Sequence, residues 1–257
     1  MKFQATGNDF IIIDGREYNY SQIPVALMCD RKFGIGADGL MIIQNKAGFD
    51  FEMIYYNSDG NTSSMCGNGG RAISKWASIL GIGGDTLHFW APDGEHTAKI
   101  ESNDIVRLKM NNVSNWQHEK GSYAVINTGS PHYINLNDHS VFEIPDDQFV
   151  HWAKEIRYSD TYKKEGINVN NVSITNSSKL LMRTYERGVE GETLSCGTGV
   201  TAAALTCALE NSLQNGEIRV QTRGGELSVE FEKTEKGFEN IWLVGPAKLV
   251  FSGNYTV

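Results

Sequence analysis

Two cysteines, Cys66 and Cys196, stand in the same local sequence, and this context indicates acid–base chemistry. Each begins a Cys-Gly-x-Gly motif that leads into a helical pattern of apolar residues. The first N–H groups of a helix have no partner inside the helix and carry partial positive charge, so they stabilise an anion such as a thiolate. A cysteine at such a position can have a pKa of about 3.5 to 7.5 instead of about 8.5. The sequence therefore predicts two activated thiols.

The repetition of the motif favours a pair of equivalent groups over a single nucleophile. A cysteine nucleophile works as one thiol with a histidine base and an oxyanion hole. Two equal thiols are typical of a reaction that inverts a carbon centre, because a thiolate can remove a proton from one face while a thiol returns one to the other. The reverse reaction exchanges the roles, so the resting site must hold one thiolate and one thiol. Both helix ends would also stabilise the charge that grows on a substrate carboxylate.

The elements that would position the cysteines also occur twice. Helices are predicted over residues 68–80 and 197–210, each after a strand and a polar loop, and a further helix over 146–157. The helix over 197–210 is apolar almost all round, as expected if strands surround it. Most other segments alternate as strands do. We therefore predict an α/β (α+β) fold with two pseudo-symmetric domains, each a mostly antiparallel sheet wrapped around a central helix, and a duplication as its origin.

The domain boundaries follow from the two cysteine motifs. We predict an N-terminal domain over residues 1–115 with Cys66 and a C-terminal domain over 116–245 with Cys196. The final strand, in residues 246–257, is expected to return to the first domain. The polar segment 111–121 is predicted to cross between the domains, and a Thr-Gly-Asn-Asp turn is predicted to place Asn8 between two strands.

The composition favours a small-molecule function. The 257 residues include 31 acidic and 23 basic side chains, for a net charge of −8. This balance indicates no basic surface for nucleic acid or an anionic membrane. No apolar run reaches the roughly 18 residues that a membrane span needs, and the first residues do not resemble a signal peptide. We predict a soluble, cytoplasmic protein.

The remaining cysteines and the histidines do not indicate a metal site or a disulfide framework. Cys29 and Cys207 lie in apolar helical patterns and are interpreted as buried small hydrophobic residues. Four cysteines without an export signal argue against disulfides. The chain has no Cys-x-x-Cys pair, and its six histidines lack ligand spacing, so no metal is expected. The Gly-Ile-Gly-Ala-Asp-Gly stretch does not have the spacing of a dinucleotide-binding loop.

Five separated segments of the chain resemble diaminopimelate epimerase, in the same order and over nearly the whole length. They are TGNDFIIID, DRKFGIGADG, YNSDGNTSSMCGNGGRA, TGSPHY and YERGVEGETLSCGTG. The resemblance implies the epimerase fold and an isomerase that needs no cofactor, pyridoxal phosphate included. Such an enzyme interconverts L,L- and meso-diaminopimelate on the route to lysine and peptidoglycan. The resemblance also implies a homodimer.

The resemblance assigns roles to residues that match the motifs. The implied catalytic residues are Cys66 and Cys196 as the acid–base pair, with His132 and Glu186 beside them to set which cysteine is charged. The implied substrate-binding residues are Asn8, Asn57, Gly67, Asn68, Ser130, Asn168, Glu186, Arg187, Gly197 and Thr198. Among these, Arg187 can bind a carboxylate through two parallel hydrogen bonds.

Two positions depart from the common pattern of the family. Gly39 stands where the family often has glutamine, and Ser130 where it often has asparagine. A serine can still form hydrogen bonds with a shorter reach, so Ser130 is kept among the binding residues. Gly39 offers only backbone groups and is left out. The loop from Glu186 to Cys196 is also one residue longer than usual.

Two other functions are compatible with parts of this pattern. One is a two-cysteine isomerase for another amino acid, such as proline or hydroxyproline. The asparagines and Arg187 argue against it, because they suit a substrate that is polar at both ends. The other is a binding or redox-sensing protein in which Cys66 and Cys196 form a disulfide. Such a protein would tolerate serine at either cysteine, whereas an epimerase would not.

Overall fold

The computed structural model describes residues 1–17, 20, 23–62, 65–101 and 104–256, and its contacts divide the chain into two compact units. Unit 1 comprises Met1–Leu108 and Gly245–Val257, and unit 2 comprises Lys109–Val244. Unit 1 therefore holds Cys66 and both chain ends, while unit 2 holds Cys196. The first crossing between the units precedes the predicted boundary at residue 115.

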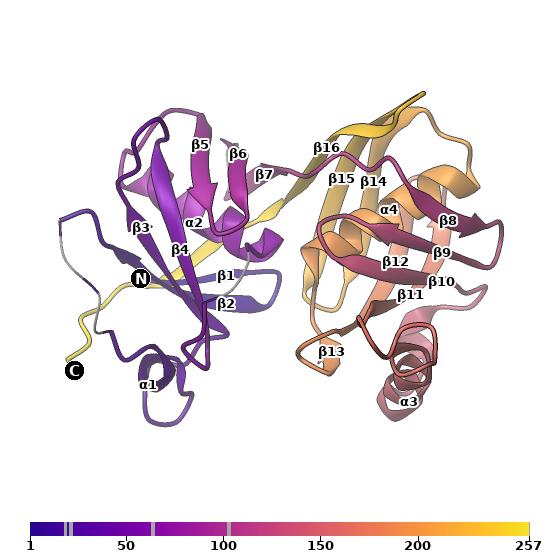
Figure 1. Cartoon of the computed structure of the whole chain (residues 1–257), viewed down its shortest axis with the longest axis horizontal. Coiled ribbons are helices and arrows are strands. Elements are labelled where there is room, and N and C mark those ends of the chain that lie inside the picture. The colour runs from indigo at the N-terminus through magenta and orange to yellow at the C-terminus, as the bar shows by residue number, and fades with distance from the viewer. Residues whose placement is uncertain (18–19, 21–22, 63–64, 102–103, 257) are drawn as a thin grey trace. The chain divides into compact units, whose positions relative to one another are not determined.

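The sheet of unit 1 combines strands from both ends of the chain. Its strands are β1 (Lys2–Ala5), β2 (Asn8–Asp14), β3 (Gly39–Gln44), β4 (Phe51–Asn57), β5 (Thr86–Ala91), β6 (Gly94–Ile100), β7 (Ile105–Lys109) and β17 (Lys248–Phe251). Neighbours follow the order β17-β1-β2-β3-β4-β5-β6-β7. Figure 1 labels each of these strands except β17. The β2–β3 and β4–β5 pairs are parallel, and the other pairs are antiparallel.

The sheet of unit 2 repeats this arrangement. Its strands are β8 (Trp116–Glu119), β9 (Tyr123–Asn127), β10 (Pro131–Leu136), β11 (Asn168–Asn176), β12 (Lys179–Glu186), β13 (Gly191–Thr193), β14 (Asn215–Thr222), β15 (Gly225–Thr234) and β16 (Gly237–Pro246). Neighbours follow the order β8-β9-β10-β11-β12-β14-β15-β16. The β10–β11 and β12–β14 pairs are parallel, and the other pairs are antiparallel. The short strand β13 pairs with the end of β12. The two units thus share one order of strand directions, which confirms the predicted fold class.

One helix lies against the sheet of each unit (Figure 1). Helix α2 (Gly67–Ile79) contacts β1, β2, β3, β6 and β17, and α4 (Gly197–Glu210) contacts β9, β10, β11, β12, β14 and β15. Nearly all of α4 is buried, as its apolar sequence predicts. Gly81 follows the end of α2 with a φ of 71°, a conformation that glycine adopts without strain. The predicted central helices are confirmed.

Smaller elements complete the two units. Unit 1 contains the short helix α1 (Val25–Cys29), and unit 2 contains α3 (Asp146–Arg157) and a 3-10 turn at Val141–Glu143. The limits of α3 agree with the predicted helix over 146–157, and two aspartates stand in its first turn, where they complement the helix dipole. Within the described part of the chain, no helix is both long and apolar enough to cross a membrane.

Two sequence predictions about loops need correction. Asn8 does not lie in the turn; it is the first residue of β2 and pairs with Ala5. The segment 111–121 also contains strand β8, although its polar sequence predicts only a crossing. This strand forms because Trp116 packs on the buried Phe238, with ring centroids 5.3 Å apart, and because β9 supplies backbone hydrogen bonds.

Candidate active site

Cys66 is the residue that caps the amino end of α2. Its backbone is extended, with φ −102° and ψ 133°, and its carbonyl oxygen accepts a hydrogen bond from the N–H of Gly70 at 2.7 Å. The half-buried side chain therefore stands where the first N–H groups of the helix favour negative charge. The structure gives this thiol the position that the sequence predicts.

The Asn8 amide has a fixed orientation beside the Cys66 thiol. Its nitrogen donates to Oδ2 of Asp38 at 2.6 Å, and a carboxylate only accepts. The carbonyl oxygen of Asn8 therefore faces Cys66, with Oδ1 3.6 Å from Sγ. The same oxygen lies 3.5 Å from Nδ2 of the buried Asn68. Asn8, Cys66 and Asn68 are thus brought together in unit 1.

Asn57 and Gly39 lie opposite each other at the ends of β4 and β3. A Cβ atom at Gly39 would lie 2.6 Å from the ring of Tyr55 and 2.7 Å from the carbonyl oxygen of Tyr56. Real Cβ atoms do not approach so closely, so this chain has no room for a longer side chain at position 39. The Tyr55 ring and the Tyr56 carbonyl oxygen together leave only glycine at this position in this chain.

Cys196 occupies the matching position at the amino end of α4. Its backbone is extended, with φ −124° and ψ 115°, and its side chain is buried, with Sγ 3.4 Å from Oγ1 of Thr198. A Cβ atom at Gly199 would lie 2.8 Å from Oδ1 of Asn170. The glycine therefore lets the start of the helix approach the polar residues of the sheet.

His132 is fully buried behind Thr198. Its Nε2 lies 2.8 Å from Oγ1 of Thr198, and its Nδ1 lies 3.1 Å from the amide nitrogen of Asn170. That amide nitrogen also donates to the carbonyl oxygen of Tyr133 at 3.0 Å, which fixes the orientation of Asn170. Nδ1 is then an acceptor and Nε2 carries the proton. Burial, and then the positive charge of Arg187, lowers the pKa of His132 to about 3.

The neutral state of His132 predicts a loss of stability in acid. Its pKa is about 3 when folded and about 6.5 when unfolded, so the unfolded chain binds more protons between these values. The neutral His132 makes its full contribution to the free energy of unfolding above about pH 6.5. This contribution falls as the pH drops, and at about pH 5 it is smaller by roughly 2 kcal/mol. Urea denaturation at about pH 5 and at a pH above about 6.5 measures this difference in the free energy of unfolding. His132→Gln, a neutral donor that does not titrate, should remove this part of the pH dependence; an equal dependence in the variant would contradict the assignment.

Asn168 connects two further predicted residues of unit 2. Its Oδ1 accepts from the backbone N–H of Arg187 at 2.8 Å, and its Nδ2 donates to Oγ of Ser130 at 2.8 Å. The Arg187 guanidinium lies 3.5 Å from the same Oγ and donates to the carbonyl oxygen of Glu165 at 2.9 Å. Ser130 thus remains part of the polar network despite its short side chain.

Glu186 is the last residue of β12 and lies opposite Gly191. In the repeated strand order it takes the position that Asn57 takes in unit 1, since both residues end the strand that precedes the cysteine loop. Its predicted effect on the charge of the cysteines stays a prediction.

We call the polar residues around Cys66 and those around Cys196 the two half-sites. They also share a similar loop, which precedes β2 in unit 1 and β10 in unit 2. Thr6-Gly7 and Thr128-Gly129 are followed by Asn8 and Ser130, and both glycines are left-handed, with φ of 86° and 108°. The threonines reach the helix starts: Thr6 Oγ1 lies 3.5 Å from Asn68 Oδ1, and Thr128 Oγ1 donates to the carbonyl oxygen of Thr198 at 2.8 Å. The similarity of the two units therefore extends from the fold to the polar contacts.

Several residues of these networks are absent from the sequence prediction. They are Thr6, Asp38, Arg71, Thr128 and Asn170. Asn170 carries a usable signal, because it stands two residues after Asn168 in a strand and so projects from the same face. Arg71 carries a second such signal, because it is a cation within the buried first part of helix α2.

The other two cysteines are structural. Cys29 and Cys207 are 3% and 0% exposed, and burial raises the pKa of each thiol to about 11. All four cysteines are free thiols. The prediction that Cys29 and Cys207 are buried is confirmed. The described residues contain no group of three or more histidine, cysteine or acidic side chains placed to hold a metal ion.

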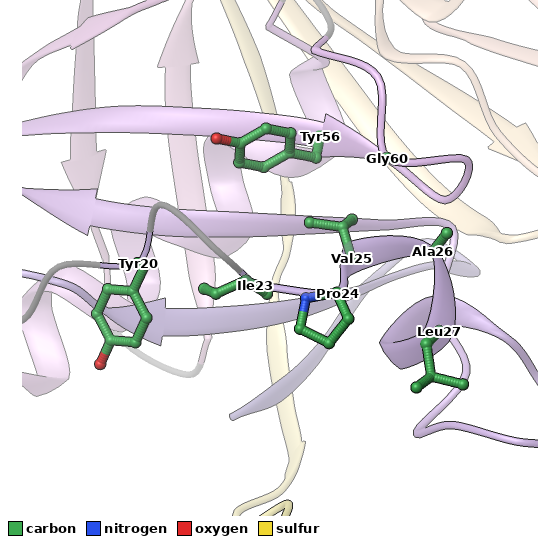
Figure 2. Close-up of a pocket in the computed structure, with 8 residues that line it drawn as sticks. All are labelled: Tyr20, Ile23, Pro24, Val25, Ala26, Leu27, Tyr56 and Gly60. Carbon is green, nitrogen blue, oxygen red and sulfur yellow. The ribbon is translucent and has the colours of Figure 1, made fainter. Parts of the chain in front are cut away.

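Unit 1 also contains a pocket, which Figure 2 shows. It is lined by Tyr20, Ile23, Pro24, Val25, Ala26, Leu27, Tyr56 and Gly60. None of these residues belongs to the predicted site, and none of them has a charged side chain.

Sequence comparisons with known proteins agree on one family. The family model described as diaminopimelate epimerase matches residues 1–116 and 124–250. A protein of Flavobacterium psychrophilum named diaminopimelate epimerase is 46% identical over 255 residues, which is 97% of each chain. Its counterpart in Chlorobaculum tepidum is 37% identical, over 98% of this chain and 99% of that protein.

Solved structures show the same fold at low identity. A PhzF-family phenazine biosynthesis protein of Bacillus anthracis has a TM-score of 0.73 and 14% identity, covering 96% of this chain and 94% of that chain. A probable proline racemase of Agrobacterium radiobacter has a TM-score of 0.67 and 14% identity, covering 100% of this chain and 92% of that chain. At such identities the likeness concerns the fold alone.

Proposed function

Because the chain belongs to the diaminopimelate epimerase family, we propose that it interconverts L,L- and meso-diaminopimelate, a step of lysine biosynthesis. The observation that carries this proposal is the occurrence of Cys66 and Cys196 at matching positions, each at the amino end of a buried helix and each within a polar network.

The proposed reaction uses the two cysteines as a base and an acid. The thiolate of one cysteine removes the α proton of the substrate, and the thiol of the other delivers a proton to the opposite face of that carbon. The N–H groups at the starts of α2 and α4 stabilise the charge that grows on the carboxylate next to the reacting carbon. For the opposite isomer, the cysteines exchange these roles.

The polar residues around each thiol would bind the substrate. In unit 1 the Asn68 amide and the Gly67 N–H serve the reacting carboxylate, and Asn8 and Asn57 bind other polar groups. In unit 2 these tasks fall to the Thr198 hydroxyl, the Gly197 N–H, Asn168, Ser130 and Arg187. The hydrogen bonds that hold Asn8 to Asp38 and Asn168 to the Arg187 backbone support this proposal, because they preorganise the amides.

His132 has a supporting role in the proposed mechanism. With its proton on Nε2, it donates to Thr198, whose own hydroxyl proton is then free to point at Cys196. A hydroxyl that donates to sulfur stabilises the thiolate, and on rotation it can accept from the thiol. Glu186 is proposed to tune the same equilibrium. None of these steps needs a cofactor.

The activity is tested with purified, reduced protein and L,L-diaminopimelate. No pyridoxal phosphate is added, and a chelator is present. Chiral chromatography should show the meso isomer growing to equilibrium. Proline and hydroxyproline serve as competing candidates. Conversion of either one without conversion of diaminopimelate would keep the two-thiol chemistry and overturn the proposed substrate.

We also propose that two copies of the chain associate. Strand β17 is the edge of the unit 1 sheet, and its side chains Leu249, Val250 and Phe251 are 44%, 56% and 50% exposed. An exposed apolar edge strand is a template for pairing with another chain. Light scattering should give about twice the 28.5 kDa of one chain, and Val250→Lys should yield monomers. A monomeric wild type, or a dimeric Val250→Lys variant, would contradict this surface.

A further inference from the structure

Glu190 connects the loop that follows β12, residues 187–190, to the end of α3. Its Oε1 accepts a hydrogen bond from Nη2 of Arg157, the last residue of α3, at 2.7 Å. Its Oε2 accepts from the hydroxyl of Tyr158 at 2.8 Å. The same Oε2 lies 3.4 Å from the hydroxyl of Tyr185, a residue of β12 that is 0% exposed. One carboxylate therefore joins the loop to a helix and a strand.

The carboxylate of Glu190 is charged at neutral pH. Burial acts to raise its pKa, but hydrogen bonds from the Gly188 N–H, the Tyr158 hydroxyl and the Arg157 guanidinium outweigh burial and hold the pKa below its usual range. Hydrogen bonds between charged partners are stronger than neutral ones. The Arg157 side chain is also only 12% exposed, so little water competes with this ion pair. The connection to α3 is therefore strong for a loop contact.

The backbone of Glu190 has a conformation that needs support. Its φ is 55°, in the left-handed region, and its N–H donates to the carbonyl oxygen of Glu186 at 2.8 Å. A residue with a Cβ atom is strained in this region, and the strain persists only where surrounding contacts hold it. A glycine would adopt the conformation without strain but could form none of the side-chain contacts. The contacts of the carboxylate thus stabilise this turn.

The loop contacts fix both peptide groups that flank Arg187. The N–H of Arg187 donates to Oδ1 of Asn168 at 2.8 Å, and the N–H of Gly188 donates to Oε1 of Glu190 at 3.2 Å. The backbone of Arg187 is therefore held on both sides, although the residue itself is exposed. Loss of the Glu190 side chain would release the second of these peptide groups, and the Arg187 side chain would then start from a variable position.

The side chains of Arg157 and Arg187 lie against the same glycine, Gly166. A Cβ atom at Gly166 would lie 2.5 Å from Cδ of Arg187 and 3.1 Å from Cζ of Arg157. Two cations that share such a place repel each other unless an anion is close to them. Glu190 supplies an anion through its 2.7 Å contact with Arg157. Its carboxylate therefore acts on Arg187 through charge as well as through the backbone.

We propose that Glu190 is a positioning residue, which fastens the loop 187–190 to α3 and thereby holds Arg187 where it can bind the substrate. The part that concerns the substrate rests on the proposed function, and the anchoring of the loop does not. Arg187 is proposed to bind the substrate and not to transfer a proton. Its displacement should therefore weaken the binding of substrate and transition state alike, so KM rises while kcat is kept.

Steady-state kinetics with L,L-diaminopimelate test the binding part. Glu190→Ala should raise KM about ten-fold and leave kcat within about two-fold of the wild type. Glu190→Gln should keep KM within about three-fold, because its amide oxygen can still accept from Arg157 and its nitrogen can donate to the Tyr158 hydroxyl. The matched control is Glu155→Ala, which removes a carboxylate that is 66% exposed on the same helix and should change neither constant.

Limited proteolysis with trypsin tests the anchoring without substrate. Trypsin cleaves after arginine and lysine, and the bond between Arg187 and Gly188 contains the N–H that Glu190 holds. In Glu190→Ala the loop should open more often, so cleavage at this bond should be about ten-fold faster. Mass spectrometry locates the cut. Cleavage after the exposed Lys236, between β15 and β16, should keep its wild-type rate.

Unchanged cleavage after Arg187 in Glu190→Ala, with folding verified by circular dichroism, would overturn the inference. If that variant does not fold, Arg157→Met breaks the same contact from the helix, and unchanged cleavage in it would overturn the inference instead. Faster cleavage with an unchanged KM, whether or not kcat falls, would show that the loop does not position Arg187 for the substrate. An inactive wild-type protein with the expected cleavage rates would refute the proposed function alone.

Discussion

Serine in place of Cys66 or of Cys196 lowers kcat/KM for epimerisation by about 100- to 10,000-fold, because general acid–base catalysis contributes roughly that factor. A hydroxyl at either helix start is about the size of the thiol but far less acidic. The helix N–H groups cannot lower its pKa enough to produce a base at neutral pH. Each variant should therefore bind substrate and fail in the chemical step, with kcat lowered far more than KM is raised.

The other two cysteines provide the matched controls for this prediction. Cys29→Ala and Cys207→Ala remove buried thiols that lie outside both polar networks. They should leave kcat/KM within a few-fold of the wild type, after correction for any unfolded fraction. A Cys196→Ser variant with near-normal activity would leave a single-cysteine mechanism or a non-catalytic thiol pair as the better account.

Arg183→Met should lower the free energy of unfolding by about 3 kcal/mol, the lower end of the range for breaking a buried ion pair. The Arg183 side chain is 0% exposed and binds Glu192 through two hydrogen bonds of 2.8 and 2.7 Å. It also lies over the Phe149 ring, 4.3 Å from the centroid. Arg223 still reaches Glu192 at 3.4 Å in the variant, which limits the loss.

A second arginine makes this prediction specific to burial. Arg16 also binds one carboxylate, that of Asp14, through two hydrogen bonds of 2.8 and 2.7 Å, but both side chains are about one-third exposed. Arg16→Met should cost no more than about 1 kcal/mol, since exposed pairs contribute little. Urea denaturation of both variants measures the contrast. Equal losses would show that burial does not determine the contribution of these pairs.

The sequence predicts the central elements of the fold because their signals are local. The Cys-Gly-x-Gly motifs mark the starts of α2 and α4, and the apolar run after Cys196 predicts a helix that strands enclose. Strand β8 is different. Its polar residues do not alternate clearly, and its position depends on Trp116 meeting Phe238, far away in the sequence.

The candidate site divides in the same way. The cysteines could be identified from their position at two helix starts, and the substrate-binding residues from the family resemblance. The network around them could not. Arg71 acts on Asn68 within one helix, but its contact with Thr6 joins residues 65 positions apart. Likewise, the absence of room at Gly39 becomes visible only when Tyr55 is in place.

The central claim is that two different groups handle the proton on the two faces of one carbon. The most direct measurement is proton NMR of L,L-diaminopimelate in D2O with the reduced protein, taken early in the reaction. The account predicts deuterium at the α carbon of the meso product from the first turnovers, while unconverted substrate still carries protium. Meso product that retains the substrate's own proton would show that one group removes and returns it, and would contradict the two-cysteine mechanism.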